Sequence, residues 1–182
     1  MAKSTQHWLI PSSPYETYAA YAKVTGEHAV QKARKLTPEA VLAEVERSGL
    51  RGRGGGGFPT GTKWGSILTH PCPTRSVVCN AAEGEPGTFK DRWLIRRNPY
   101  AVLEGMLIAA HVVKSHELYI AIKESFGPEI ERLQRAIEEL KGAGLLDGCT
   151  VKIVPGPEEY LFGEEKALLN VLEGQGPLPR EA

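Results

Sequence analysis

Three short apolar runs rich in β-branched residues alternate with three helical patterns from residue 77 onward. The runs are 77–79, 118–122 and 151–154, and the helical patterns cover about 99–113, 128–142 and 164–173. Alternation of strand and helix predicts an α/β fold whose parallel sheet has right-handed crossovers and flanking helices. Such sheets bind ligands in the loops beyond the carboxyl ends of their strands, so we look for function in those loops.

The first 50 residues predict a helical segment that precedes the sheet. From Tyr15 to Lys35 the pattern is loosely helical and polar. Thr37, Pro38 and Glu39 then supply a helix with an N-cap hydroxyl, a first-position proline and an acidic first turn. Its apolar stripe comprises Val41, Leu42, Val45 and Leu50, and it ends at Gly49. We therefore divide the chain into a helical segment, 1–50, and an α/β domain, 51–182.

Charge and composition exclude several classes of protein. The 22 basic and 22 acidic side chains cancel, so no overall field attracts nucleic acid or an anionic membrane. The longest apolar stretch, 101–113, is shorter than the ~20 residues of a membrane-spanning helix. The N-terminus has no apolar run of signal-peptide length. We expect a cytoplasmic protein, at most peripheral to a membrane complex, without nucleic-acid partners or direct membrane contact.

The three cysteines do not suggest a metal centre. Cys72, Cys79 and Cys149 lie far apart without a C-x2-C pair, and the histidines show no metal-ligand spacing. We interpret the cysteines as structural or incidental thiols and expect no bound metal. No Ser-His-Asp or Cys-His set can be identified from the spacing either.

The segment from Leu50 to Trp64, LRGRGGGGFPTGTKW, is the glycine-rich part of the chain. Its six glycines let backbone N–H groups wrap a phosphate, and Arg51, Arg53 and Lys63 add positive charge. It contains G-x-G-x-x-G over 52–57, but a helix precedes it where a Rossmann turn needs a strand, and it lacks the Gly-Lys-Ser/Thr of a P-loop. A flexible linker is the alternative, although the embedded aromatic residues favour a binding loop.

Two further segments combine glycine with polar side chains. CNAAEGEPGTFKD, residues 79–91, leaves the first predicted strand at its carboxyl end and carries Asn80, Glu83 and Glu85. An amide and two carboxylates can hydrogen-bond ribose or a flavin edge, whereas a polar surface turn is the structural alternative. YLFGEE, residues 160–165, places glycine and two acids at a helix start, where acids also occur simply as partners of the helix dipole.

Taken together, RGRGGGGFPTGTKW, CNAAEGEPGTFKD and YLFGEEKALLNVLEG resemble the flavin-binding, NADH-oxidising subunit of respiratory complex I. They are similar also to the diaphorase subunits of NAD-linked hydrogenases and formate dehydrogenases. The resemblance runs from about Thr37 to the C-terminus. It implies a Rossmann-like domain over 51–182 that holds FMN, takes hydride from NADH and passes electrons singly to iron–sulfur partner subunits.

Carried over by position, the resemblance also assigns site residues. It places the following against the flavin phosphate and ring: Gly52, Arg53, Gly54, Gly55 and Lys63. Asn80 and Glu83 are expected nearby, and the flavin site is closed by Gly163, Glu164 and Glu165. For NADH it implies that Phe58 stacks on adenine, that Tyr160 lines the pocket and that Glu85 and Glu165 border the nicotinamide and ribose. No catalytic acid or base is implied, because hydride transfer requires positioning.

The sequence departs from the family pattern at several positions. Ala82 replaces the aspartate of the usual N-A-D-E-G-E loop, and Ser66 stands where an aromatic residue is usual. Phe162 replaces a cysteine, Lys166 a threonine and Gly56 an alanine. A second interpretation therefore stays open, in which the chain is a scaffold or assembly subunit whose site has decayed and does not turn over NADH.

Family members continue beyond the end of this sequence. They add further flavin contacts, a small ubiquitin-like domain and a four-cysteine helical domain that binds [4Fe-4S]. We expect any [4Fe-4S] cluster to lie in such a C-terminal domain or in partner subunits. The 182 residues are expected to be either a piece of a longer subunit or a short protein that needs partners.

Overall fold

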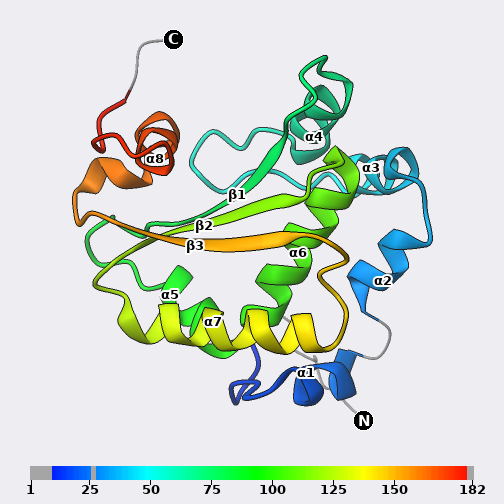
Figure 1. Cartoon of the computed structure of the whole chain (residues 1–182), viewed down its shortest axis with the longest axis horizontal. Coiled ribbons are helices and arrows are strands. Elements are labelled where there is room, and N and C mark those ends of the chain that lie inside the picture. The colour runs from blue at the N-terminus through cyan, green and yellow to red at the C-terminus, as the bar shows by residue number, and fades with distance from the viewer. Residues whose placement is uncertain (1–9, 26–27, 180–182) are drawn as a thin grey trace.

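The computed structural model describes residues 10–25 and 28–179, which form one parallel sheet with helices on both faces (Figure 1). The strands are β1 (Ser76–Ala81), β2 (Glu117–Lys123) and β3 (Thr150–Gly156). The helices before the sheet are α1 (Tyr18–Thr25), α2 (Ala29–Arg34), α3 (Pro38–Arg47) and α4 (Thr60–Thr69). The later ones are α5 (Asp91–Arg97), α6 (Pro99–Val113), α7 (Gly127–Gly142), the 3-10 helix η1 (Tyr160–Gly163) and α8 (Glu165–Leu172).

The sheet has the strand order β1-β2-β3, and both pairs are parallel, as the sequence predicts. In the register, Leu118 lies between Val77 of β1 and Val151 of β3. Helices α6 and α7 provide the two crossovers. All three strands therefore end at one edge of the sheet, the side on which η1 and α8 lie in Figure 1.

The main core lies between the sheet and the helices α6 and α7. Alternate residues of β2 face it, and they are almost completely buried together with apolar residues of both helices: Leu103, Leu107, Leu118, Ile120, Ile122, Leu133 and Leu140. The opposite face carries a smaller cluster around Ala121, over which Phe162 of η1 and Leu168 of α8 pack. Burial of both faces of the central strand is the usual condition of a parallel sheet.

Close packing seats η1 directly on the sheet. A Cβ added to Gly156, the last residue of β3, would lie 2.3 Å from the Phe162 ring. The Phe162 side chain is fully buried there. Glycine is therefore required at this strand end, because any larger residue would push η1 away from the sheet.

The N-terminal helices pack against the same crossover helices. Helices α2 and α3 contact α6, and α1 contacts α7. The Tyr21 hydroxyl of α1 donates a hydrogen bond to the buried carboxylate of Glu104 on α6. Thr37 caps α3 as predicted, by accepting from the Ala40 N–H at 3.2 Å, a contact worth about 1 kcal/mol.

Helix positions agree with the sequence patterns, with three differences. The pattern at 99–113 is α6, and those at 128–142 and 164–173 correspond to α7 and α8 within two residues. Contrary to the prediction, Leu50 does not belong to the stripe of α3: it lies beyond that helix and is 51% exposed. Helices α4 and α5 were not expected, since α4 has two glycines in its first six residues and α5 is too short for a periodic signal. Within the described residues no helix has both the length and the apolarity to cross a bilayer.

Candidate functional site

A cleft of about 740 Å³ lies where the strands end. It has three walls, from the glycine-rich segment, from the loop after β1 and from η1 with the start of α8. Its lining comprises Arg53, Gly54, Gly55, Asn80, Ala82, Glu83, Gly84, Glu85, Thr88, Lys90, Asp91, Tyr160, Leu161, Gly163 and Glu164. The volume lies within the roughly 300–1,000 Å³ typical of cofactor sites. The three segments singled out in the sequence therefore meet in space.

The first wall is the glycine loop, residues 52–58. An antiparallel bridge between Arg51 and Pro59 closes its base, with the Gly52 N–H donating to the Phe58 carbonyl at 2.9 Å. The backbone N–H groups of 53–57 donate to no other described residue. Gly55 and Gly57 have φ values of +99° and +57°, which other residues rarely adopt. The loop thus presents free donors to the cleft, with the Arg53 cation beside them.

The second wall is the carboxylate turn, residues 83–91. The Glu83 side chain is only 1% exposed, and its carboxylate accepts from the backbone N–H groups of Lys90 and Asp91 at 2.7 and 3.1 Å. It also accepts from Arg92 Nε at 3.0 Å. Burial works to raise the pKa of Glu83, but these hydrogen bonds hold that pKa below its usual value. Glu83 is therefore an ionised group committed to the protein backbone and Arg92.

The third wall, η1 with the start of α8, is joined to β1 by the side-chain amide of Asn80. Asn80 Nδ2 donates to the Gly163 carbonyl at 2.8 Å, and its Oδ1 accepts from the Ala82 N–H at 3.2 Å. A Cβ on Gly163 would come 3.0 Å from the Ala82 carbonyl. Glu164 caps α8 by accepting from the Ala167 N–H at 2.9 Å. Asn80 thus joins β1 to η1, and Glu164 has a structural role at a helix N-terminus.

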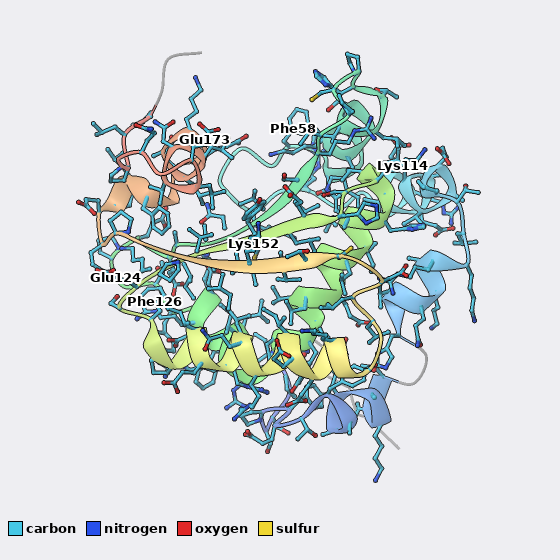
Figure 2. The ribbon with its side chains drawn as sticks, viewed as in Figure 1. Phe58, Lys114, Glu124, Phe126, Lys152 and Glu173 are labelled. Carbon is cyan, nitrogen blue, oxygen red and sulfur yellow. The ribbon has the colours of Figure 1, made fainter. Side chains whose placement is uncertain are left out.

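Four residues assigned by sequence lie outside the cleft lining. Gly52 sits at the base of the glycine loop, and Phe58, at its other end, is 57% exposed. Figure 2 shows Phe58 above the sheet, between α4 and α8. Lys63 of α4 and Glu165 of α8 form an exposed ion pair with Nζ and Oε1 3.7 Å apart. The remaining nine assigned residues line the cleft.

Neither Phe162 nor Trp64, the two large side chains that would fill a decayed site, occupies the cleft. The Phe162 side chain packs between η1 and the sheet. Trp64 packs against buried apolar residues of α2, α3 and α6, so neither side chain lines the cleft. Ala82 lines the cleft but is only 3% exposed.

Three polar lining residues were not assigned from the sequence: Thr88, Lys90 and Asp91. The sequence did contain a signal for them, because all three lie at the end of the same CNAAEGEPGTFKD segment. Lys90 Nζ pairs with Asp91 Oδ1 at 2.8 Å, and this hydrogen bond raises the pKa of Lys90. Across the described ranges, no three His, Cys, Asp or Glu side chains gather closely enough to hold a metal ion. The cleft therefore offers backbone donors, two cations and several carboxylates, a set suited to a phosphate-bearing ligand with hydroxyl groups.

Comparison with known proteins gives a consistent family. The family model described as the Nuo51 FMN-binding domain matches residues 45–182. A subunit of the NADH-quinone oxidoreductase of Aquifex aeolicus is 40% identical over 168 residues, which cover 88% of this chain and 39% of that protein. The subunit of the same name from Mycobacterium tuberculosis is 38% identical over 189 residues, or 97% of this chain and 42% of that protein. The chain thus spans about two fifths of the length of these relatives.

Solved structures of an NAD+-reducing [NiFe]-hydrogenase share the fold. The H2-reduced state matches with a TM-score of 0.80 at 36% identity, over 98% of this chain and 29% of that chain. The air-oxidized state matches with a TM-score of 0.76 at 36% identity, over 86% of this chain and 28% of that chain. The sheet and its helices are therefore similar to those of a known oxidoreductase chain.

Proposed function

Because the chain belongs to the family of the Nuo51 FMN-binding domain, we propose that it is the nucleotide-binding part of an NADH-oxidising flavin subunit. Its bound cofactor would be FMN and its hydride donor NADH. The observation that carries this proposal is the convergence of three walls on one cleft at the carboxyl ends of the parallel strands. Ligands of open α/β sheets bind at this place.

The glycine loop fits the phosphate of FMN. The N–H groups of 53–57 donate to no described residue, and those of Arg53, Gly54 and Gly55, which line the cleft, can bind phosphate oxygens. A Cβ added to Gly54 would meet no atom within 4 Å, so the loop has room for a ligand against its backbone. Arg53 would neutralise part of the phosphate charge, and Gly52 and Gly55 would give the loop its shape.

The two other walls would hold the flavin ring. Asn80 and Gly163, which both line the cleft, hold the end of β1 against η1, and the flavin ring would lie in a slot beside this junction. Glu83 and Glu164 would act by fixing the backbone around this slot, since their carboxylates are already bound to N–H groups. The chemistry that bound FMN would supply here is acceptance of hydride from NADH and release of electrons one at a time.

The exposed groups at the cleft mouth would receive NADH. Phe58 offers a ring face for the adenine, and Tyr160, 62% exposed, would line the nicotinamide side. Glu85 would bind ribose hydroxyls from the carboxylate turn. Lys63 and Glu165, which pair with each other, would separate, so that Lys63 contacts the flavin phosphate and Glu165 borders the nicotinamide and ribose of NADH.

Electrons would leave through iron–sulfur partner subunits. The relatives are named as subunits of an NADH-quinone oxidoreductase, and the solved match is a hydrogenase that reduces NAD+. A [4Fe-4S] acceptor would belong to a further domain or to a partner. The scaffold interpretation is disfavoured by the open cleft, because neither Trp64 nor Phe162 occupies it.

Absorption and fluorescence spectra test the proposal directly. The protein as it occurs, with any further segments and subunits, would be examined alone, with FMN and then with NADH under anaerobic conditions. We expect bound flavin whose absorption NADH bleaches. Bound flavin without bleaching would contradict NADH as donor, and absence of flavin binding would contradict the proposal in favour of a scaffold.

A further inference from the structure

Arg92 connects the first residue of the carboxylate turn, Glu83, with Thr88 in its middle. Its Nε donates to the buried Glu83 carboxylate at 3.0 Å, and its Nη2 donates to the Thr88 carbonyl at 2.9 Å. The guanidinium group therefore uses two edges of its rigid fork for two different parts of the same turn. Its side chain is 27% exposed, so both contacts are partly shielded from water.

Two aromatic rings fix the plane of this guanidinium group. Its central carbon lies 4.4 Å from the Phe89 ring centroid and 4.6 Å from that of Phe126. Figure 2 shows Phe126 at the turn between β2 and α7, so the second ring comes from a different loop. Stacking of this kind restricts a side chain that would otherwise have many rotamers.

Thr88 in turn holds the backbone of Glu85 in place. The Thr88 hydroxyl and N–H both donate to the Glu85 carbonyl, at 2.7 and 3.2 Å. A continuous set of contacts thus runs from Glu83 through Arg92 and Thr88 to Glu85. Glu85 is the carboxylate that remains available on this wall, since the Glu83 carboxylate is already bound and Asp91 pairs with Lys90.

We propose that Arg92 is a positioning residue that fixes the turn 85–88 and thereby sets the affinity of the cleft for the dinucleotide donor. This inference rests on the proposed function, because it takes Glu85 as a contact of NADH. Arg92 does not line the cleft. It acts through the backbone of Thr88, which separates its role from that of the glycine loop and the flavin.

The test compares Arg92→Gln and Arg92→Lys with Arg96→Gln in the complete protein. Arg96 is a matched control, because it lies one helical turn further along α5, with its guanidinium carbon 5.1 Å from the Phe89 ring centroid, and pairs with Glu129. Amide hydrogen exchange of the peptide spanning 84–89 measures the turn without any ligand. FMN affinity, and KM and kcat for NADH, measure the site.

We expect Arg92→Gln to speed exchange over 84–89 and to raise KM for NADH about tenfold, below the roughly 100-fold that a misplacement of about 1 Å can cost. FMN affinity and kcat should stay within about twofold, which a general loss of folding would not allow. Arg92→Lys should behave like the glutamine variant, since an ammonium group cannot span both contacts. Arg96→Gln should match the wild type in exchange over 84–89, in FMN affinity and in KM and kcat for NADH.

Three results would overturn the inference. Unchanged exchange over 84–89 in Arg92→Gln would show that Arg92 does not hold the turn. Full rescue by Arg92→Lys would show that charge alone matters, and an equal loss of FMN and NADH affinity would make the residue a general support of the cleft. A wild-type protein that binds FMN but not NADH would contradict the proposed function, whereas the exchange result would still decide whether Arg92 holds the turn.

Discussion

The glycine loop and the carboxylate turn line the same cleft, yet their polar groups are satisfied in opposite ways. In the glycine loop, N–H groups of 53–57 donate to no described residue, and hydrogen bonds close only its base. In the carboxylate turn, Glu83, Arg92 and Thr88 join its two ends through contacts of 2.7–3.1 Å. One wall thus leaves its hydrogen bonds to a ligand, and the other is organised before a ligand arrives.

The two walls therefore differ in how much conformational entropy each loses when a ligand binds. A wall that is already organised loses little conformational entropy on binding, so its contacts contribute most of their energy to affinity. A loop of free N–H groups can follow the shape of a phosphate but must be ordered by it. Substitutions in the glycine loop should therefore affect ligand retention, whereas substitutions in the carboxylate turn should affect folding stability as well.

The largest effect is expected for Gly54→Leu. Gly54 lines the cleft, has no positive φ and has no atom within 4 Å of an added Cβ, so the substitution fills ligand space without straining the fold. We expect FMN affinity to fall about 100-fold, since overpacking costs about 1–3 kcal/mol. Gly56→Leu is the matched control, because Gly56 shares the open surroundings but does not line the cleft. Equal loss in both variants, measured by flavin fluorescence titration, would contradict this account of the loop.

Glu83→Gln should lower the stability of the folded protein. The carboxylate accepts three hydrogen bonds, and hydrogen bonds to a charged group contribute about 1.5–3 kcal/mol, so unfolding free energy should fall by roughly that amount. Urea denaturation measures this change. The control is Glu85→Gln, whose side chain makes no such contacts with the described residues and should leave stability within about 0.5 kcal/mol of wild type.

The same carboxylate predicts how stability depends on acid. Its pKa is lower in the folded protein than the usual 4.5, so the unfolded chain binds more protons in this range. The stabilisation is complete above the unfolded pKa and is lost as pH falls through the folded pKa. Between about pH 5 and pH 3 the wild type should therefore lose more stability than Glu83→Gln. Parallel acid profiles would show that Glu83 is not ionised against Arg92.

Phe58→Ala should weaken the binding of NADH and leave the binding of FMN unchanged. Stacking of a base on an aromatic ring contributes about 1–3 kcal/mol, so NADH affinity should fall about tenfold. FMN affinity should not change, because Phe58 lies outside the cleft lining. Isothermal titration with each ligand checks both values, with Ile67→Ala on α4 as an exposed apolar control. Weaker FMN binding in Phe58→Ala would place the ring in the flavin site instead.

Sequence patterns predicted the sheet and the long helices because those elements carry local signals. The apolar runs of β1, β2 and β3, the Thr37 cap and the period of α7 can all be recognised within a few residues. Topology accounts for the meeting of segments 79–91 and 160–165, because both follow strands that end at a common edge, whereas the glycine loop lies before β1 and follows no strand. Helix α5 was missed because seven residues hold too little periodicity.

The roles of individual carboxylates could not be predicted in the same way. Local sequence gives Glu83 and Glu85 the same character, but only Glu83 turns inward to bind the backbone N–H groups at 90 and 91. Arg92 lies outside the segment that drew attention, and its part depends on Phe126, which comes from another loop. Such assignments depend on the conformation of the turn and, for Arg92, on a contact with a distant loop, which a composition or a spacing does not contain.

The smallest effect is expected for the ion pair between Lys63 and Glu165, which joins the glycine-loop side of the cleft mouth to α8. Both side chains are mostly exposed, so the pair should add no more than about 0.5 kcal/mol, or about 1–2 °C in melting temperature. Glu39→Gln is a matched control for Glu165→Gln, because Glu39 Oε1 lies 3.6 Å from Lys114 Nζ in a similarly exposed pair away from the cleft. Both variants should melt within that range of the wild type, and added salt should remove the difference. A clearly larger loss in Glu165→Gln would mean that the pair holds the two sides together before a ligand binds, and the glycine loop would then be more organised than its free N–H groups indicate.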